Sequence, residues 1–149
     1  MSLDQTLNTL LVSLFRDILD IEEGSLITEE YRDITVNDMH VIEAIGISEP
    51  KPSSVVAKKL DITMGTLTKA IDGLTNKLYV NRERSTEDKR VVLLSLTEKG
   101  KRAFHHHATF HQNMIDAVMG QLDEEERVVL TKSLEDLIKY LKAFGEDKH

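Results

Sequence analysis

Residues 51–100 read KPSSVVAKKLDITMGTLTKAIDGLTNKLYVNRERSTEDKRVVLLSLTEKG, and the spacing of their apolar residues changes partway along the segment. From residue 64 an apolar residue recurs every three or four positions, which predicts a helix over Met64–Leu78 with an apolar stripe of Met64, Leu67, Ile71, Leu74 and Leu78. The opposite face carries small or hydrogen-bonding residues and one lysine: Gly65, Thr66, Thr68, Lys69, Asp72 and Asn76. Such a face suits the major groove of DNA.

A shorter helix is expected before this one, over Pro52–Leu60, with Pro52 at its first helical position. Asp61 and Ile62 then form a tight turn, and Thr63 is a suitable N-cap for the longer helix. Two helices joined by a tight turn predict a helix-turn-helix, in which the longer helix is the recognition helix.

Two short strands are predicted after the recognition helix, over Tyr79–Arg84 and Arg90–Leu96. A hairpin beside a recognition helix is a wing, and this one carries four cations: Arg82, Arg84, Lys89 and Arg90. An arginine on a thin loop can enter the minor groove of DNA. Asp88 stands two residues before Arg90 and can brace its guanidinium through a bidentate contact.

The runs LDITMGTLTKAIDGL (60–74) and RERSTEDKRVVLLSLTEKGK (82–101) resemble the MarR family of winged-helix repressors. That family has an Asp-x-Arg pattern in the wing (Asp88 and Arg90) and then a Leu-Thr-x-x-Gly step, here Leu96, Thr97 and Gly100. Residues 32–46, RDITVNDMHVIEAIG, resemble the FabT-type subgroup, which represses fatty-acid synthesis genes with long-chain acyl-acyl carrier protein as corepressor. The family usually has Thr or Ser as an N-cap where Lys51 stands, so the helix after it starts near Ser53, or Lys51 binds a phosphate.

The 149 residues are expected to form one mainly α-helical domain with a small β-hairpin wing. Residues 34–100 would form the winged helix-turn-helix, and residues 1–33 and 101–149 the dimerisation helices. The net charge of −7 argues against a nucleic-acid partner at first sight, because cations that neutralise phosphates supply much of the affinity for duplex DNA. However, residues 51–102 contain 12 Lys and Arg against 6 Asp and Glu, so a basic centre lies between acidic arms. This segregation favours double-stranded DNA as the partner.

Apolar residues at helical spacing predict long helices at both ends of the chain. The first covers Leu3–Glu23, and a polar connection, Gly24–Asp33, leads to a second helix over Ile34–Gly46 with a capping box at Thr35 and Asp38. Near the C-terminus one helix follows the N-cap Thr97 to about Gln121, and another runs from the capping box of Asp123 and Glu126 to Gly145. These apolar faces predict a twofold homodimer, which would set two recognition helices about one DNA turn apart.

We expect DNA contacts from two groups of residues: Ser53, Ser54, Thr63, Gly65, Thr66, Thr68 and Lys69 in the helix-turn-helix, and Arg82, Arg84, Asp88, Lys89 and Arg90 in the wing. The polar helix face could also be only the solvated side of an amphipathic helix. The neighbouring turn and wing favour DNA.

Four histidines, His105, His106, His107 and His111, follow the wing. His107 and His111 have a spacing that can bind zinc, and His40 with Glu22 or Glu23 could complete a site. Histidines on an interface helix also pack and form hydrogen bonds without a metal, so no resident metal or cofactor is predicted. A zinc- or small-ligand-responsive repressor of metal uptake or efflux genes remains the alternative function.

Five large apolar residues, Phe15, Met39, Phe104, Phe110 and Met114, either border a cavity for an acyl chain or small effector or belong to the ordinary core. No phosphate-binding loop or nucleophile motif predicts an enzyme. The absence of cysteine excludes disulfides and thiol redox switches. Without a signal peptide or a long apolar run, the protein is expected to be cytoplasmic and to have no membrane partner.

Overall fold

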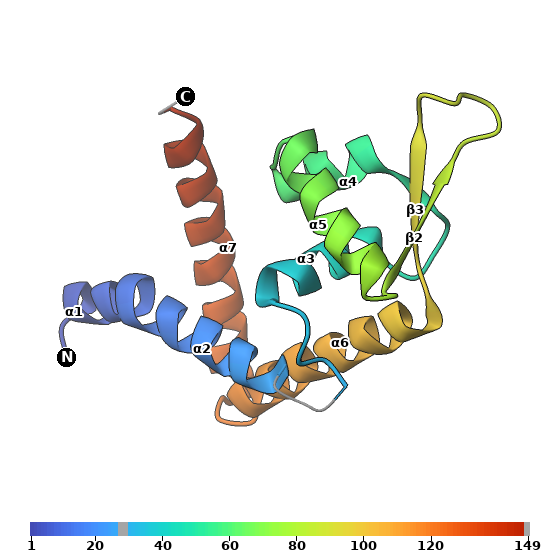
Figure 1. Cartoon of the computed structure of the whole chain (residues 1–149). Helices are drawn as coiled ribbons and strands as arrows, with labels where there is room; N and C mark the ends of the chain where they lie inside the picture. Colours follow the sequence, from blue (N-terminus) through green and yellow to red (C-terminus); the bar gives the residue numbers. More distant parts are fainter. Residues whose placement is uncertain (27–29, 148–149) are drawn as a thin grey trace. The chain divides into compact units, whose positions relative to one another are not determined.

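The computed structural model describes residues 1–26 and 30–147, and the chain divides into two compact units, residues 1–110 and residues 111–149 (Figure 1). The first unit contains most of the secondary structure, in the order α1 (Leu3–Asn8), the π-helical segment η1 (Thr9–Leu14), α2 (Phe15–Leu26), α3 (Val36–Ile45), β1 (Lys51–Pro52), α4 (Ser53–Leu60), α5 (Met64–Asn76), β2 (Val80–Arg84), β3 (Val92–Leu96) and the start of α6 (Glu98–Met119). The second unit contains the end of α6 and α7 (Glu124–Glu146). The mainly α-helical winged helix-turn-helix fold is therefore confirmed.

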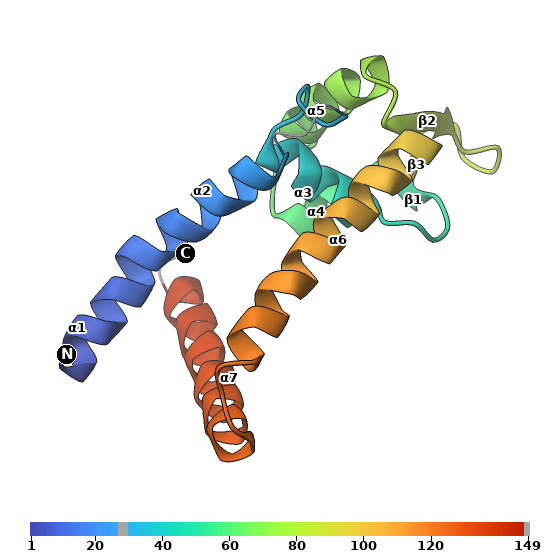
Figure 2. The ribbon, with the colours of Figure 1, turned by 90° about the horizontal axis from the view of Figure 1, so that it is seen from below.

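The N-terminal helical run is longer than the predicted Leu3–Glu23. The π-helical segment joins α1 to α2 without a break, and α2 continues to Leu26, so that both views show one rod (Figures 1 and 2). Gly24 does not end the helix because it lacks the left-handed conformation that makes glycine a C-cap. The predicted connection Gly24–Asp33 is shortened accordingly. Its residues 27–29 lie outside the described residues, and Glu30–Asp33 form a turn.

Local caps set the limits of α3, which is shorter than the predicted Ile34–Gly46. Thr35 Oγ1 accepts a hydrogen bond from Asp38 N at 3.1 Å, and Asp38 Oδ2 accepts one from Thr35 N at 3.0 Å, so the expected capping box is confirmed. Gly46 ends the helix with a left-handed φ of +72°. The inward face of α3 is buried through Met39, Ile42 and Ile45.

The core of the first unit forms where α3, α4, α5 and the sheet pack together. Ala57 is buried in α4, where its small side chain permits close helix packing. Asp61 ends α4 in the left-handed conformation, with φ of +54°. Thr63 then caps α5 by accepting a hydrogen bond from Thr66 N at 3.2 Å. The predicted helix, turn and helix are confirmed.

The start of α4 differs from the prediction. Pro52 does not occupy the first helical position but lies in the two-residue strand β1, where it pairs with Leu93 of β3. Lys51 pairs with Leu94, and its Nζ donates a hydrogen bond to the carbonyl of Ile45 at 2.5 Å. The expected hairpin is thus part of a three-stranded antiparallel sheet of order β1-β3-β2, and α4 starts at Ser53.

The recognition helix is shorter than the predicted Met64–Leu78. Helix α5 ends at Asn76, and Leu78 has a left-handed φ of +69° and 69% of its surface exposed. Met64, at the other end of the predicted stripe, is half exposed, so the buried stripe consists of Leu67, Ile71 and Leu74. The turn at Leu78 allows Tyr79 to enter the core before β2 starts.

The second unit contains the C-terminal helices. The capping box of Asp123 and Glu126 begins α7 as predicted, whereas α6 ends at Met119 and α7 continues past Gly145 to Glu146. All residues of α7 are described, and none of them is buried. Residues 148 and 149 lie outside the described residues. Within the described part of the chain, every helix is too short or too polar to cross a membrane.

Candidate nucleic-acid interface

The polar face of α5 is exposed at the residues predicted to contact DNA. Gly65, Thr66, Thr68 and Lys69 all lie on the surface. The hydroxyls have partners within the helix: Thr68 Oγ1 donates to the carbonyl of Met64 at 2.8 Å, and Thr66 Oγ1 lies 2.9 Å from Thr63 Oγ1. Both threonines can therefore offer their methyl groups outward, and a thymine methyl is a suitable apolar partner in the major groove.

The start of α4 and the lysine of α5 supply groups that suit phosphate. Pro52 provides no side-chain cap to α4, so the first N–H groups of the helix and the hydroxyls of Ser53 and Ser54 can donate to an anion. Lys69 forms no side-chain hydrogen bond or ion pair with any residue that the structure describes. Its charge is available to a phosphate or to guanine.

The wing holds Arg90 in a fixed orientation. Asp88 Oδ1 accepts hydrogen bonds from Arg90 N at 3.0 Å and Nε at 3.1 Å, and Asp88 Oδ2 accepts one from the second terminal nitrogen at 3.2 Å. The hydrogen bonds from the side chain and backbone of Arg90 lower the pKa of Asp88. The Arg90 side chain is nevertheless 91% exposed, so the predicted brace is confirmed and the guanidinium points into solvent.

The other wing arginines make contacts within the protein. Arg82 on β2 forms an ion pair with Asp72 on α5, with a nitrogen–oxygen distance of 2.5 Å. Arg84 donates to the carbonyl of Lys89 at 2.8 Å and so closes the wing loop. These arginines connect the wing to α5 and to its own tip, a role that the charge pattern alone did not predict. Strand β3 starts at Val92, so Arg90 belongs to the loop rather than to the predicted strand.

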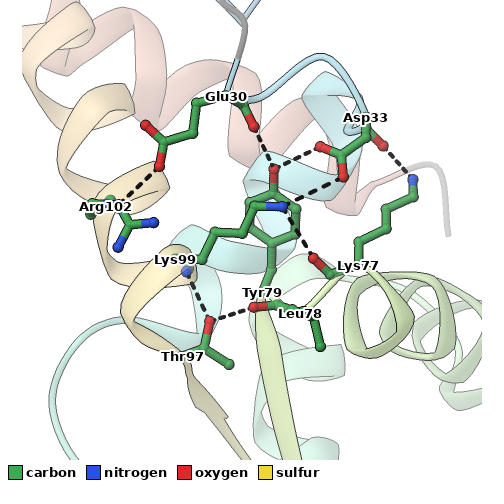
Figure 3. Close-up of polar contacts among 9 residues, drawn as sticks. Glu30, Asp33, Lys77, Leu78, Tyr79, Thr97, Lys99 and Arg102 are labelled. Atoms are coloured by element: carbon green, nitrogen blue, oxygen red, sulfur yellow. Dashed lines mark hydrogen bonds and ion pairs between the residues drawn. The ribbon is translucent and has the colours of Figure 1, made fainter.

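The Leu-Thr-x-x-Gly step fixes the start of α6 to the end of α5 (Figure 3). Thr97 Oγ1 donates to the carbonyl of Leu78 at 2.6 Å, and Thr97 N donates to the carbonyl of Tyr79 at 3.0 Å. Gly100 N donates to Thr97 Oγ1 at 3.1 Å, which caps α6 as predicted. The motif therefore joins the first turn of α6 to the residues that follow the recognition helix.

A buried cluster of histidine and glutamate lies in the first unit, away from the wing. His107 is fully buried, and its Nε2 lies 3.0 Å from Glu22 Oε1 and 3.1 Å from Glu43 Oε1. His40 Nε2 lies 3.4 Å from Glu22 Oε1. The sequence prediction named His40, His107 and Glu22 but missed Glu43, although it follows His40 by one helical turn. His111 belongs to the second unit.

Of the five apolar residues predicted to border a cavity or belong to the core, Met39 is fully buried in the core and Phe104 packs against it, whereas Phe15 is largely exposed. A cavity of about 530 Å³ lies between α2, the turn before α3, and α3. Its lining combines apolar and polar groups: Leu19, Glu23, Tyr31, Arg32, Ile34, Thr35, Val36, Asn37 and His40. Glu23, considered as a metal ligand, thus lines this cavity instead of joining the cluster.

A tight turn before an exposed polar helix, with a braced arginine on the adjacent hairpin, defines a winged helix-turn-helix DNA-binding protein. The family model of the SarA/Rot transcriptional regulators matches residues 24–107. The chain is 30% identical to the HTH-type transcriptional regulator PchR of Bacillus subtilis, over 97% of this chain and 83% of that protein. It therefore belongs to the MarR-like family of winged-helix transcriptional regulators, and it is a DNA-binding transcriptional regulator.

Two further similarities refine this relationship. The structure of Streptococcus pneumoniae FabT in complex with DNA is 37% identical in sequence, with a TM-score of 0.87, over 94% of this chain and 98% of that one. The HTH-type transcriptional repressor YetL of Bacillus subtilis is 36% identical over 91 residues. This match covers 61% of the present chain and 54% of YetL, so the chain spans about half the length of that relative.

Proposed function

We propose that this protein is a homodimeric repressor that binds a pseudo-palindromic operator. In each protomer α5 enters the major groove, and the wing places Arg90 in the flanking minor groove. The braced and exposed guanidinium of Arg90 carries this proposal, because an arginine held away from the protein surface loses little freedom when it binds. Lys69, Lys89 and the first turn of α4 add phosphate contacts.

Two exposed apolar surfaces support the dimer. In the first unit, the rod of α1, η1 and α2 exposes large apolar side chains: Leu3, Leu11, Val12, Leu14, Phe15, Leu19 and Ile21. In the second unit, α7 exposes Val128, Val129, Leu130, Leu134, Ile138, Tyr140, Leu141 and Phe144. Surfaces of this kind favour association. A twofold axis would pair two recognition helices with the two halves of the operator.

The proposed targets are fatty-acid synthesis genes, with long-chain acyl-acyl carrier protein as corepressor. This part rests on the FabT-type resemblance of residues 32–46 and on the similarity to FabT over nearly the whole chain. A corepressor acts by binding more tightly to the DNA-competent arrangement of the two protomers than to the others.

The test is fluorescence anisotropy on the DNA upstream of the protein's own gene and of the fatty-acid synthesis genes, with and without palmitoyl-acyl carrier protein. We expect specific binding that tightens with the acylated carrier and not with the unacylated carrier. If specific binding does not change with acylation of the carrier, the proposed corepressor is wrong, but the proposed repressor function is still supported. Equal affinity for operator and scrambled DNA would refute both.

The buried cluster supports a second candidate, a repressor that responds to zinc. The ligand atoms of His40, Glu43 and His107 lie within 4.8 Å of one another, and Glu22 contacts both histidines. Imidazole nitrogens and carboxylate oxygens are ordinary zinc ligands, so the donor set fits this ion. Zinc binding here would link α3 to α6 within the first unit, and occupancy would then affect the position of the DNA-binding elements.

Isothermal titration calorimetry with zinc distinguishes the two candidates. The wild type should give a saturable heat that is lost in His40→Ala, while the exposed His105→Ala serves as the matched control. Operator affinity measured with zinc and with a chelator should then differ in the wild type only. If the wild type shows no saturable heat, the zinc candidate is wrong.

A further inference from the structure

Three parts of the first unit meet at the side chain of Tyr79: the turn Glu30–Asp33, the end of α5 and the first turn of α6 (Figure 3). Tyr79 is fully buried, and its hydroxyl donates to Asp33 Oδ1 at 2.7 Å. The Lys99 ammonium lies 4.3 Å from the centre of the Tyr79 ring and 3.7 Å from Asp33 Oδ2. The Asp33 carboxylate therefore contacts both Tyr79, three residues beyond the end of the recognition helix, and Lys99 of α6.

Asp33 also contacts the last turn of α5 directly. Lys77, the C-cap residue of α5, donates from Nζ to the backbone carbonyl of Asp33. Lys99 Nζ donates to the backbone carbonyl of Lys77 at 3.3 Å. The side chain and the backbone of Lys77 are thus held from two directions, by the turn before α3 and by α6.

We infer that Asp33 is a positioning residue, which holds the C-terminal end of the recognition helix to the turn before α3 and to α6, and so sets the orientation of α5 for operator binding. The inference rests on the proposed function, since the orientation of α5 matters only where α5 reads DNA.

The bonds of Asp33 are suited to positioning rather than to global stability. The Asp33 side chain is almost half exposed, and ion pairs at such sites contribute little to the free energy of unfolding. The hydrophobic core that surrounds Tyr79 is independent of the Asp33 carboxylate. Asp33→Ala, which removes both carboxylate oxygens, should therefore fold normally, and Tyr79→Phe, which removes only the hydroxyl, provides a second variant with the same expected effect.

The first measurement is amide hydrogen exchange in the DNA-free protein. The amides of Lys77, Leu78 and Tyr79 donate to the carbonyls of Gly73, Thr75 and Leu74 at 3.0, 3.1 and 2.9 Å. In Asp33→Ala and in Tyr79→Phe these three amides should exchange about tenfold faster, whereas the amides of the first turns of α5 should be unchanged. The control Lys101→Gln, on the surface of α6, should match the wild type. Unchanged exchange at residues 77–79, or a uniform increase throughout the unit, would overturn the inference.

The second measurement is binding to DNA recovered by in vitro selection with the wild-type protein. Both variants should bind this DNA about two- to thirtyfold more weakly, with unchanged affinity for random-sequence DNA and an unchanged salt slope. The double variant should lose little more than either single variant, because the two residues act through one contact. Unchanged specific affinity in both variants would contradict the inference. If selection recovers no sequence, the proposed function fails, and the exchange measurement still decides whether Asp33 positions α5.

Discussion

Gly100 in the first turn of α6 packs directly against the backbone of Tyr79. A Cβ atom at residue 100 would overlap the carbonyl oxygen of Tyr79 and lie 3.2 Å from the Cβ of Leu96. Because these neighbours are backbone atoms of Tyr79 and the Cβ atom of Leu96, they can move only if the backbone itself shifts. We expect Gly100→Ala to destabilise the protein by about 1–3 kcal/mol, as overpacking in a core does. Urea denaturation followed by circular dichroism would measure it.

Gly24 supplies the matched control for this substitution. It lies within α2, and a Cβ at this residue would meet nothing within 4 Å. Alanine has the higher helix propensity, so Gly24→Ala should leave the urea midpoint unchanged or raise it, by up to about 1 kcal/mol in stability. Equal effects of the two substitutions would show that the close approach of Gly100 to Tyr79 is not what requires glycine there.

Arg90 is expected to contribute to DNA binding without contributing to folding. Its guanidinium is exposed and, among the residues that the structure describes, bonds only to Asp88 of its own loop, so Arg90→Ala should leave the urea midpoint within error of the wild type. Its operator affinity should fall roughly fivefold to a hundredfold at physiological salt, with a smaller slope of affinity against salt concentration. Fluorescence anisotropy at several salt concentrations would measure both quantities, with Lys101→Gln as a control of equal charge change. An unchanged operator affinity would mean that the wing does not reach the DNA.

The features that depend on neighbouring residues were predictable from the sequence. The capping boxes at Thr35 and Asp123 and the brace of Arg90 by Asp88 each join residues two or three positions apart. In such cases, short-range geometry leaves few alternatives. The buried middle of the recognition helix was predictable for a related reason, since its apolar spacing is regular over three turns.

The features that depend on distant residues were not predictable in the same way. Leu78 has the spacing of a fifth stripe residue, but the chain turns there so that Tyr79 can reach Asp33, 46 positions earlier. Strand β1 has two residues, too few for any period, and exists only because β3 lies beside it. The pairing of Arg82 with Asp72 likewise depends on how the wing folds back onto α5.

Asp33 should make stability depend on pH in the acidic range. Partial burial opposes ionisation of this carboxyl, but the Tyr79 hydroxyl and the Lys99 and Lys77 ammonium groups outweigh it, so the pKa of Asp33 lies below its usual value. A lowered pKa in the folded state adds stability above the unfolded pKa of about 4, and this contribution is lost as the pH falls through the folded pKa. Because this carboxylate is almost half exposed, the difference in urea midpoint between the wild type and Asp33→Asn should be small, and it should be largest near pH 6 and shrink below pH 4. A constant difference from pH 6 to pH 3 would exclude this linkage.

The apolar face of α7 should control assembly. Ile138 is 54% exposed on α7, where a large aliphatic residue has no stabilising role unless another surface covers it. If α7 contributes to the dimer interface, Ile138→Glu places a charge in that interface and should convert dimers to monomers at micromolar concentration in sedimentation velocity. Operator affinity should then fall steeply, since one protomer holds only half of the site. Lys132→Gln, on the same helix, should remain dimeric. A wild type that sediments as a monomer, or an Ile138→Glu variant that remains a dimer, would contradict the assignment of α7 to the interface.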